Sequence, residues 1–177
     1  MGNGKDIIET VAAKKEVAIM KLGVIADTHL DRITRELVDL MAGPFKDVDL
    51  VLHAGDITEI DILRAFSGKE MMAVCGNMDS PAVRKQLPPQ RTFLAGKFRI
   101  GLIHGWGSPH GIEERIHRGF EGVDCIVYGH THAPSLNTRE NILFFNPGTF
   151  GSGFPWGKNS FGVLDIGDTI SGKIFYL

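Results

Sequence analysis

The sequence predicts a mixed α/β domain in which two stacked sheets carry helices on their outer faces. The first half of the chain alternates between short apolar runs and segments of helical periodicity, in the order β-α-β-α-β. The second half consists mostly of paired runs separated by short turns, a pattern typical of hairpins. The first three runs are nearly all apolar, as expected of strands that are covered on both faces.

The first half is expected to contain three strands, each followed by a helix. Apolar residues recur at helical spacing from Ile33 to Met41, and Gly43-Pro44 ends that helix. The expected strands are 21–26, 49–53 and 71–75, and the expected helices are 32–42, 59–67 and a short one after Pro81.

The second half is expected to contain hairpins around one helix and one buried strand. A turn at 95–97 separates the first pair of strands, and its glycine suits a tight hairpin. The expected elements are strands 91–94 and 98–103, helix 111–119, strand 124–128, strands 135–139 and 142–146, and strands 161–166 and 170–177.

The chain has 177 residues, which suggests one domain with at most a small appendage. We expect residues 1–19 to form a helical extension and residues 20–177 to form the domain. Residues 5–16 place Ile7 and Val11 on one apolar face. This helix either packs on the outside of the domain or forms a contact in a homo-oligomer.

Composition excludes several classes of protein. The chain has 19 basic and 21 acidic residues, and a formal net charge of −2 argues against a large nucleic-acid-binding surface. No apolar run reaches about 18 residues, so we expect no membrane span. Cys75 and Cys125 both lie in apolar runs, which favours buried, reduced thiols and a cytoplasmic location.

Polar side chains follow five of the apolar strands. In open α/β sheets, ligands bind outside the carboxyl ends of the strands. Side chains two apart on extended backbone project to the same side, so the members of each Asp-x-His or His-x-His pair can converge. One such pattern is common in turns, but five at strand ends indicate a site. The segments are Asp27-Thr28-His29, Gly55-Asp56, Gly76-Asn77-Met78-Asp79, His104-Gly105 and Gly129-His130-Thr131-His132.

The donor atoms of these segments suit transition metals. Oxygen and nitrogen donors without sulfur favour Mn, Fe, Zn, Ni or Co, and disfavour Ca and a sulfur-bound structural zinc. Seven donors are too many for one catalytic ion that keeps a water. They fit two ions that share a bridging carboxylate, an arrangement that clamps an in-line displacement at phosphorus. The seven are Asp27, His29, Asp56, Asn77, His104, His130 and His132.

The order of these motifs resembles that of the calcineurin-like metallophosphoesterases. The short spacing and the later Asn146-Pro147-Gly148-Thr149 are similar to the small prokaryotic phosphodiesterase branch, which includes the retromer scaffold subunit of eukaryotes. The resemblance spans about residues 20–177. It implies a four-layer α-β-β-α sandwich and a metal-dependent phosphodiesterase that hydrolyses small phosphodiesters. The alternative on the same fold is a non-catalytic protein-binding scaffold, and the seven competent donors favour the enzyme.

The resemblance also assigns roles to individual residues. It implies a bridging hydroxide that attacks phosphorus, with Mn as the first expected ion and Ni, Fe, Zn or Co as alternatives. Asp79 either orients a ligand or the substrate, or is an ordinary turn carboxylate. The implied first metal is held by Asp27, His29 and His132, the second by Asn77, His104 and His130, and Asp56 bridges them. The implied catalytic residues are Asp56, Asn77, Asp79 and His104.

Two positions depart from the pattern of the family. Met78 stands where many family enzymes have a histidine that assists the leaving group, and Trp106 stands where this branch usually has a second histidine in His-Gly-His. His53 is expected to be an imidazole of the core or one that supports a ligand, and His117 is expected to lie on a solvated face. His110 is a candidate acid or substrate contact. The aromatic residues of 148–160 are expected to contact either a substrate base or a neighbouring subunit.

Overall fold

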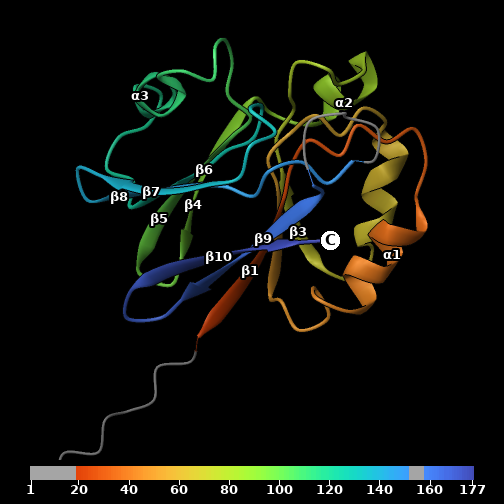
Figure 1. The fold of residues 1–177 in the computed structure, drawn as a ribbon, viewed down its shortest axis with the longest axis horizontal. Coiled ribbons are helices and arrows are strands. Elements are labelled where there is room, and N and C mark those ends of the chain that lie inside the picture. Colours follow the sequence, from red (N-terminus) through yellow and green to blue (C-terminus); the bar gives the residue numbers. More distant parts are fainter. Residues whose placement is uncertain (1–18, 152–157) are drawn as a thin grey trace, which may run out of the picture.

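The computed structural model describes residues 19–151 and 158–177 as two stacked five-stranded sheets with helices on their outer faces (Figure 1). The α/β sandwich expected from the sequence is therefore confirmed. The predicted helix at 5–16 lies outside the described residues. Within them, no helix is long and apolar enough to cross a membrane.

The first sheet has the strand order β10-β9-β1-β2-β3. Its members are β1 (Met20–Ile25), β2 (Leu50–His53), β3 (Glu70–Ala73), β9 (Ser160–Ile166) and β10 (Ile170–Tyr176). β1 pairs in parallel with β2, and β2 pairs in parallel with β3. The C-terminal hairpin β9–β10 returns to this sheet, where β9 runs antiparallel to β1.

The second sheet has the order β4-β5-β6-β8-β7. Its members are β4 (Gln90–Ala95), β5 (Phe98–Ile103), β6 (Cys125–Val127), β7 (Ser135–Arg139) and β8 (Ile142–Asn146). β5, β6 and β8 are parallel, and the antiparallel strands β4 and β7 form the edges. Each sheet therefore has a parallel trio, and ligand sites form at the carboxyl ends of such strands.

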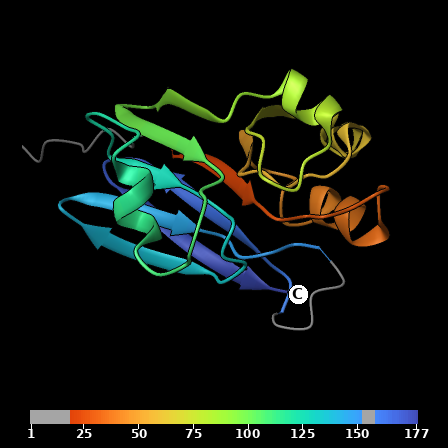
Figure 2. The same cartoon turned by 90° about the horizontal axis from the view of Figure 1, so that it is seen from above.

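The helices cover the two outer faces of the sandwich. They are α1 (Arg35–Ala42), the 3₁₀ helix η1 (Ile60–Phe66), α2 (Pro81–Gln86) and α3 (Ile112–His117). Both ribbon views place α1 and α2 on one side and α3 on the other (Figures 1 and 2). α1 begins three residues later than the sequence pattern suggested, because Thr34 caps the helix by accepting a hydrogen bond from the Leu37 N–H.

Three apolar clusters hold the four layers together. Between the sheets, Leu22 and Val24 of β1 pack with residues of the second sheet such as Leu102. The next residue of β1, Ile25, points the other way and joins the cluster under α1 and η1. A third cluster joins α3 to the second sheet. Strands covered on both faces explain the near-continuous apolar runs in the sequence. Both cysteines are free, but only Cys125 is buried; Cys75 is half-buried.

Candidate metal centre

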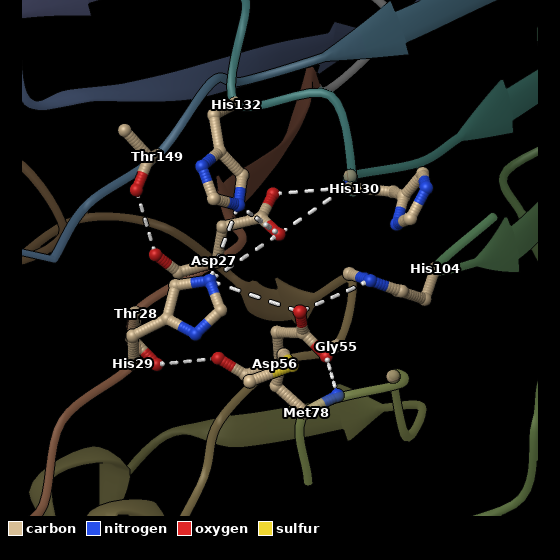
Figure 3. Close-up of polar contacts among 12 residues, drawn as sticks. Asp27, Thr28, His29, Gly55, Asp56, Met78, His104, His130, His132 and Thr149 are labelled. Atoms are coloured by element: carbon tan, nitrogen blue, oxygen red, sulfur yellow. Dashed lines mark hydrogen bonds and ion pairs between the residues drawn. The ribbon is translucent and has the colours of Figure 1, made fainter. Parts of the chain in front are cut away.

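The loops after β1, β2, β3, β5 and β6 meet at one end of the sandwich, and all seven predicted donors come together there. Figure 3 labels six of them, all except Asn77. Loops of the two sheets are linked directly. The His104 ring, after β5, lies 2.9 Å through Nδ1 from the Ala54 carbonyl, after β2. The His130 N–H, after β6, donates to both oxygens of Asp27, at 3.2 and 3.0 Å. The site is thus built across the sandwich.

Four residues form a first donor group: Asp27, His29, Asp56 and His132, whose ligand atoms all lie within 4.8 Å of one another. His132 Nε2 lies 3.2 Å from His29 Nε2 and 3.4 Å from Asp27 Oδ1. His29 Nε2 lies 3.7 Å from Asp56 Oδ2. Ligands bound at about 2.1 Å around a tetrahedral or octahedral ion are separated by about 3.0–3.4 Å. Two of the three separations lie within that range, and the group is compact enough to be a candidate metal site.

A second donor group consists of Asn77, His104, His130 and, again, Asp56. Asn77 Oδ1 lies 3.1 Å from His104 Nε2 and 2.9 Å from His130 Nδ1. His104 Nε2 lies 3.3 Å from Asp56 Oδ2. Figure 3 shows the Asp56 carboxylate between His29 and His104. One oxygen, Asp56 Oδ2, is therefore shared by both groups, as a bridging ligand would be.

Backbone carbonyls fix which ring nitrogen each of two histidines presents. A carbonyl only accepts, so His104 donates through Nδ1 to Ala54 and His130 donates through Nε2 to the Gly107 carbonyl at 2.8 Å. In the neutral rings, the lone pairs of His104 Nε2 and His130 Nδ1 then face the Asn77 oxygen. With the Asn77 amide in this orientation, three lone pairs converge on one region, so this donor set fits a metal ion.

The donor loops are bent into an unusual backbone conformation. Five donors have left-handed backbone, with φ between 45° and 71°: Asp27, His29, Asp56, His130 and His132. They make up five of the eight non-glycine residues with positive φ in the described part of the chain. This conformation costs about 1–2 kcal/mol per residue and persists only where the surroundings impose it.

Two motif glycines allow neighbouring loops to approach the carboxylates. A Cβ at Gly76 would lie 2.2 Å from Asp56 Oδ1, and a Cβ at Gly129 would lie 2.8 Å from Asp27 Oδ2. Any side chain at either position would push on a carboxylate of the donor groups. The same approach brings the Met78 N–H to 2.7 Å from Asp56 Oδ1, so this oxygen is held while Oδ2 faces both donor groups.

The carboxylates and imidazoles shift each other's protonation. Burial raises the pKa of Asp56, but the hydrogen bond and charge of His104 outweigh it and hold the pKa below its ordinary value. Burial lowers the pKa of His104, but its hydrogen bond to Asp56 and the charge of Asp27 raise it above its ordinary value overall. The hydrogen bond to Asp27 likewise raises the pKa of His132. Metal binding competes with these protons, so affinity for an ion should rise with pH.

Asp79 is buried and uses both carboxylate oxygens on backbone donors. Oδ1 accepts from the Thr58 N–H and Oδ2 from the Gly76 N–H, each at 2.6 Å. The side chain thus ties the loop after β2 to the loop after β3. Arg84 fixes the second loop further, because it donates to the Asp79 carbonyl at 3.0 Å and to the Asn77 carbonyl at 2.5 Å.

His53 is fully buried beneath the donors, as expected of a core imidazole. Its Nδ1 accepts the Gly55 N–H at 3.2 Å, which leaves the proton on Nε2 to donate to Thr28 Oγ1 at 3.2 Å. Thr28 Oγ1 donates in turn to the Asp56 carbonyl at 3.4 Å. Burial, with the charge of His104 next, lowers the pKa of His53 to about 3.

The end of β8 and the segment that follows it support the site in a way that their motif did not indicate. Asn146 Nδ2 donates to the Gly129 carbonyl at 2.9 Å, and Thr149 Oγ1 donates to the Asp27 carbonyl at 2.8 Å. Its position in the sequence could have indicated this role, because this segment is a sixth polar stretch that follows an apolar strand. Thr28, between two donors, carried no signal of its own.

Other residues that the sequence singled out lie apart from the donor groups. His117 is half-buried, with its ring 6.2 Å from that of Phe144. His110 is exposed and lines a cavity of about 400 Å³ with Thr131. Phe150 is buried in the cluster under the helices, so it does not face a substrate. Phe154 and Trp156 lie outside the described residues.

Comparison with known proteins identifies the family. Residues 20–169 match the profile of the calcineurin-like phosphoesterase superfamily domain. The chain belongs to this superfamily. Calcineurin-like phosphoesterases bind divalent metals, and the first donor group is a candidate site for one. The family resemblance of the motifs is thereby confirmed.

Relatives of this calcineurin-like chain are named as metallophosphoesterases or phosphodiesterases, in agreement with the superfamily. It is 38% identical to a probable metallophosphoesterase of Methanothermobacter thermautotrophicus, over 73% of this chain and 77% of the relative. It is 26% identical to a phosphodiesterase of Methanocaldococcus jannaschii, over 82% of this chain and 93% of the relative. The structure of vacuolar protein sorting 29 from Cryptosporidium parvum matches with a TM-score of 0.70 and 22% identity, over 90% of this chain and 99% of that chain. This match shows that the two proteins share a fold.

Proposed function

We propose that this chain is a metal-dependent phosphodiesterase that holds two divalent transition-metal ions, with Mn as the first candidate, and hydrolyses small phosphodiesters. The observation that carries the proposal is the position of Asp56 Oδ2, which lies 3.7 Å from His29 Nε2 in one donor group and 3.3 Å from His104 Nε2 in the other. The names of the relatives support the same reaction class.

The charge of the centre suits a phosphodiester. The donor set contributes two negative charges, from Asp27 and Asp56, while neutral imidazoles and the Asn77 amide contribute none. With two divalent ions the centre would carry about two net positive charges, which attract the single negative charge of a phosphodiester. Bound ions would supply Lewis acidity toward the phosphoryl oxygen and an activated water for in-line attack.

The chain's own residues would position the reactants in this scheme. Asp56, Asn77 and His104 would hold the centre that contacts the phosphate. Asp79 would act as a positioning residue, because both of its oxygens are engaged by backbone N–H groups. Met78 is 60% exposed beside the centre, but its thioether cannot donate a proton. Leaving groups that are stable as anions would therefore react fastest.

The wider organisation remains part of the proposal. Residues 20–177 would form the metallophosphoesterase domain, with residues 1–19 as an extension available for a homo-oligomer contact. The two free thiols favour a reducing compartment such as the cytoplasm. The scaffold alternative rests on the fold likeness to vacuolar protein sorting 29. Retention of every donor in one place favours catalysis, since a scaffold does not need competent ligands.

Metal removal and one substitution test the proposal. Chelator-treated protein should lose hydrolysis of bis(4-nitrophenyl) phosphate, and Mn²⁺ or Ni²⁺ should restore it better than Ca²⁺, because imidazoles disfavour an oxygen-seeking ion. Asp56→Asn should lower kcat/KM by about 10³-fold or more and reduce the bound metal below two ions per chain, because the shared charge is lost.

Asp61→Asn is the matched control, since its carboxylate is 71% exposed on η1 and should leave both quantities unchanged. Full activity in excess chelator with no metal by elemental analysis would contradict the proposal. Two bound ions without hydrolysis of any tested phosphodiester would favour the scaffold.

A further inference from the structure

We propose that a small pocket beside Asn77 and His104 binds an uncharged, flat aromatic group on one ester arm of the substrate, and that Trp106 selects for this group. The inference deepens the proposed function and rests on it, because it assumes that the substrate phosphate binds at the metal centre. The ligand class is an aryl or nucleobase-bearing phosphodiester.

The pocket opens directly at the second donor group. It has a volume of about 260 Å³, and its walls include Asn77, His104, Trp106, Cys75 and Pro89. Two of these residues are metal donors in the proposed site, so a phosphate held there would place one of its ester arms at the pocket. Pockets for drug-sized ligands measure about 300–1,000 Å³, so this one fits a group of one or two rings.

Trp106 presents an exposed indole from an anchored backbone. The side chain is 49% exposed, although tryptophan is among the more buried residue types. Its carbonyl accepts a hydrogen bond from Arg115 Nε at 2.9 Å, and Arg115 also donates to the Ser108 carbonyl. The next carbonyl, that of Gly107, accepts from His130 Nε2 at 2.8 Å. The loop is thus tied both to α3 and to a metal donor.

An anchored loop matters because a preordered aromatic ring loses little conformational entropy when a ligand stacks on it. An indole that is 49% exposed beside the donor groups is open to contact a bound ester arm. Because this side chain is aromatic, it favours a second π system over an aliphatic group.

The charges around the pocket favour an uncharged arm. Arg84 is the one residue of permanent charge among the residues that line the pocket, and its guanidinium already donates to the carbonyls of Asn77 and Asp79. No acidic residue lines the pocket in the described part of the chain. An ammonium headgroup would therefore find no carboxylate there, whereas a neutral ring requires none.

Direct binding of two phosphonates tests the inference without turnover. Phenylphosphonate and methylphosphonate carry the same metal-binding group, so the ratio of their dissociation constants, measured by calorimetry on the Mn-loaded protein, reports the aromatic arm. We expect the wild type to prefer phenylphosphonate and Trp106→Ala to reduce the preference about 5- to 150-fold, the range of single aromatic stacking contacts. Trp106→Phe should retain most of it and Trp106→Leu should not.

The control is Leu94→Ala, which removes a side chain 69% exposed on β4 and should leave the ratio unchanged. Metal content and the methylphosphonate constant should stay the same in all variants, which shows that the centre is intact. Equal affinity of the wild type for both ligands, or an undiminished preference in Trp106→Ala, would overturn the inference alone. Failure of the protein to bind metal or methylphosphonate would overturn the proposed function and this inference with it.

Discussion

Gly76 lies directly behind the Asp56 carboxylate, and replacing it with alanine tests how tightly that carboxylate is held. The added methyl carbon would lie 2.2 Å from Asp56 Oδ1 and 2.6 Å from the Asp56 backbone nitrogen. Non-bonded atoms relax at about 3.5 Å, so about 1 Å of separation must be recovered. Neither partner can yield easily, because Oδ1 accepts the Met78 N–H and the nitrogen belongs to the backbone.

A displacement of about 1 Å at a catalytic group costs on the order of 10²-fold in rate. We therefore expect Gly76→Ala to lower kcat/KM for bis(4-nitrophenyl) phosphate by about that factor and to weaken metal binding, with an unchanged circular dichroism spectrum. Gly167→Ala is the control, because its Cβ would meet only Ile19 Cγ1 at 3.6 Å, an ordinary contact. Wild-type turnover and metal content in Gly76→Ala would refute the steric argument.

His53 should make the free energy of unfolding depend on pH, because its pKa is about 3 in the folded chain and 6.5 in the unfolded chain. The contribution of the neutral His53 to stability is fully present above pH 6.5. It falls as the pH drops toward 3, by up to about 1.4 kcal/mol per pH unit. Urea titrations of chelator-treated wild type and His53→Gln between pH 4 and 7.5 should diverge in acid, and parallel curves would contradict this. For Met78, kcat/KM should fall steeply as leaving-group pKa rises across a phosphodiester series, and Met78→His should flatten the slope, since general acids contribute about 10²–10⁴-fold. A flat wild-type line would identify another proton donor.

The sequence predicted the elements well because their signals are local. Strands β5, β7 and β8 have the bounds expected from the sequence, and the other strands differ by at most two residues at either end. The strand that pairs with β9 was harder to predict from the sequence. It pairs with β1, so that Met20 lies opposite Ile166 across most of the chain. Apolar periodicity reports which face a residue takes but not which distant strand it joins.

The donors were predictable for a related reason. Each follows an apolar strand, and strand ends converge by topology. The residues that support the donors could not be predicted, because their role depends on a partner that is far away in the sequence. Thr149 is 122 residues from the Asp27 carbonyl to which it donates, and Thr28 is 25 residues from the His53 ring. Neither distance leaves a pattern in a single sequence.

Several donors are held by groups from other motifs, and in the proposed site this separates the donor frame from the residues that would face the substrate. The Met78 N–H holds Asp56, whereas the Met78 side chain is 60% exposed. The Trp106 carbonyl is held by Arg115, whereas its indole is 49% exposed. Both positions contribute backbone to the frame and leave the side chain to solvent. An imidazole could therefore stand at either position without moving a donor, so the departures from the family pattern at 78 and 106 are expected to alter leaving-group and substrate preference rather than metal binding.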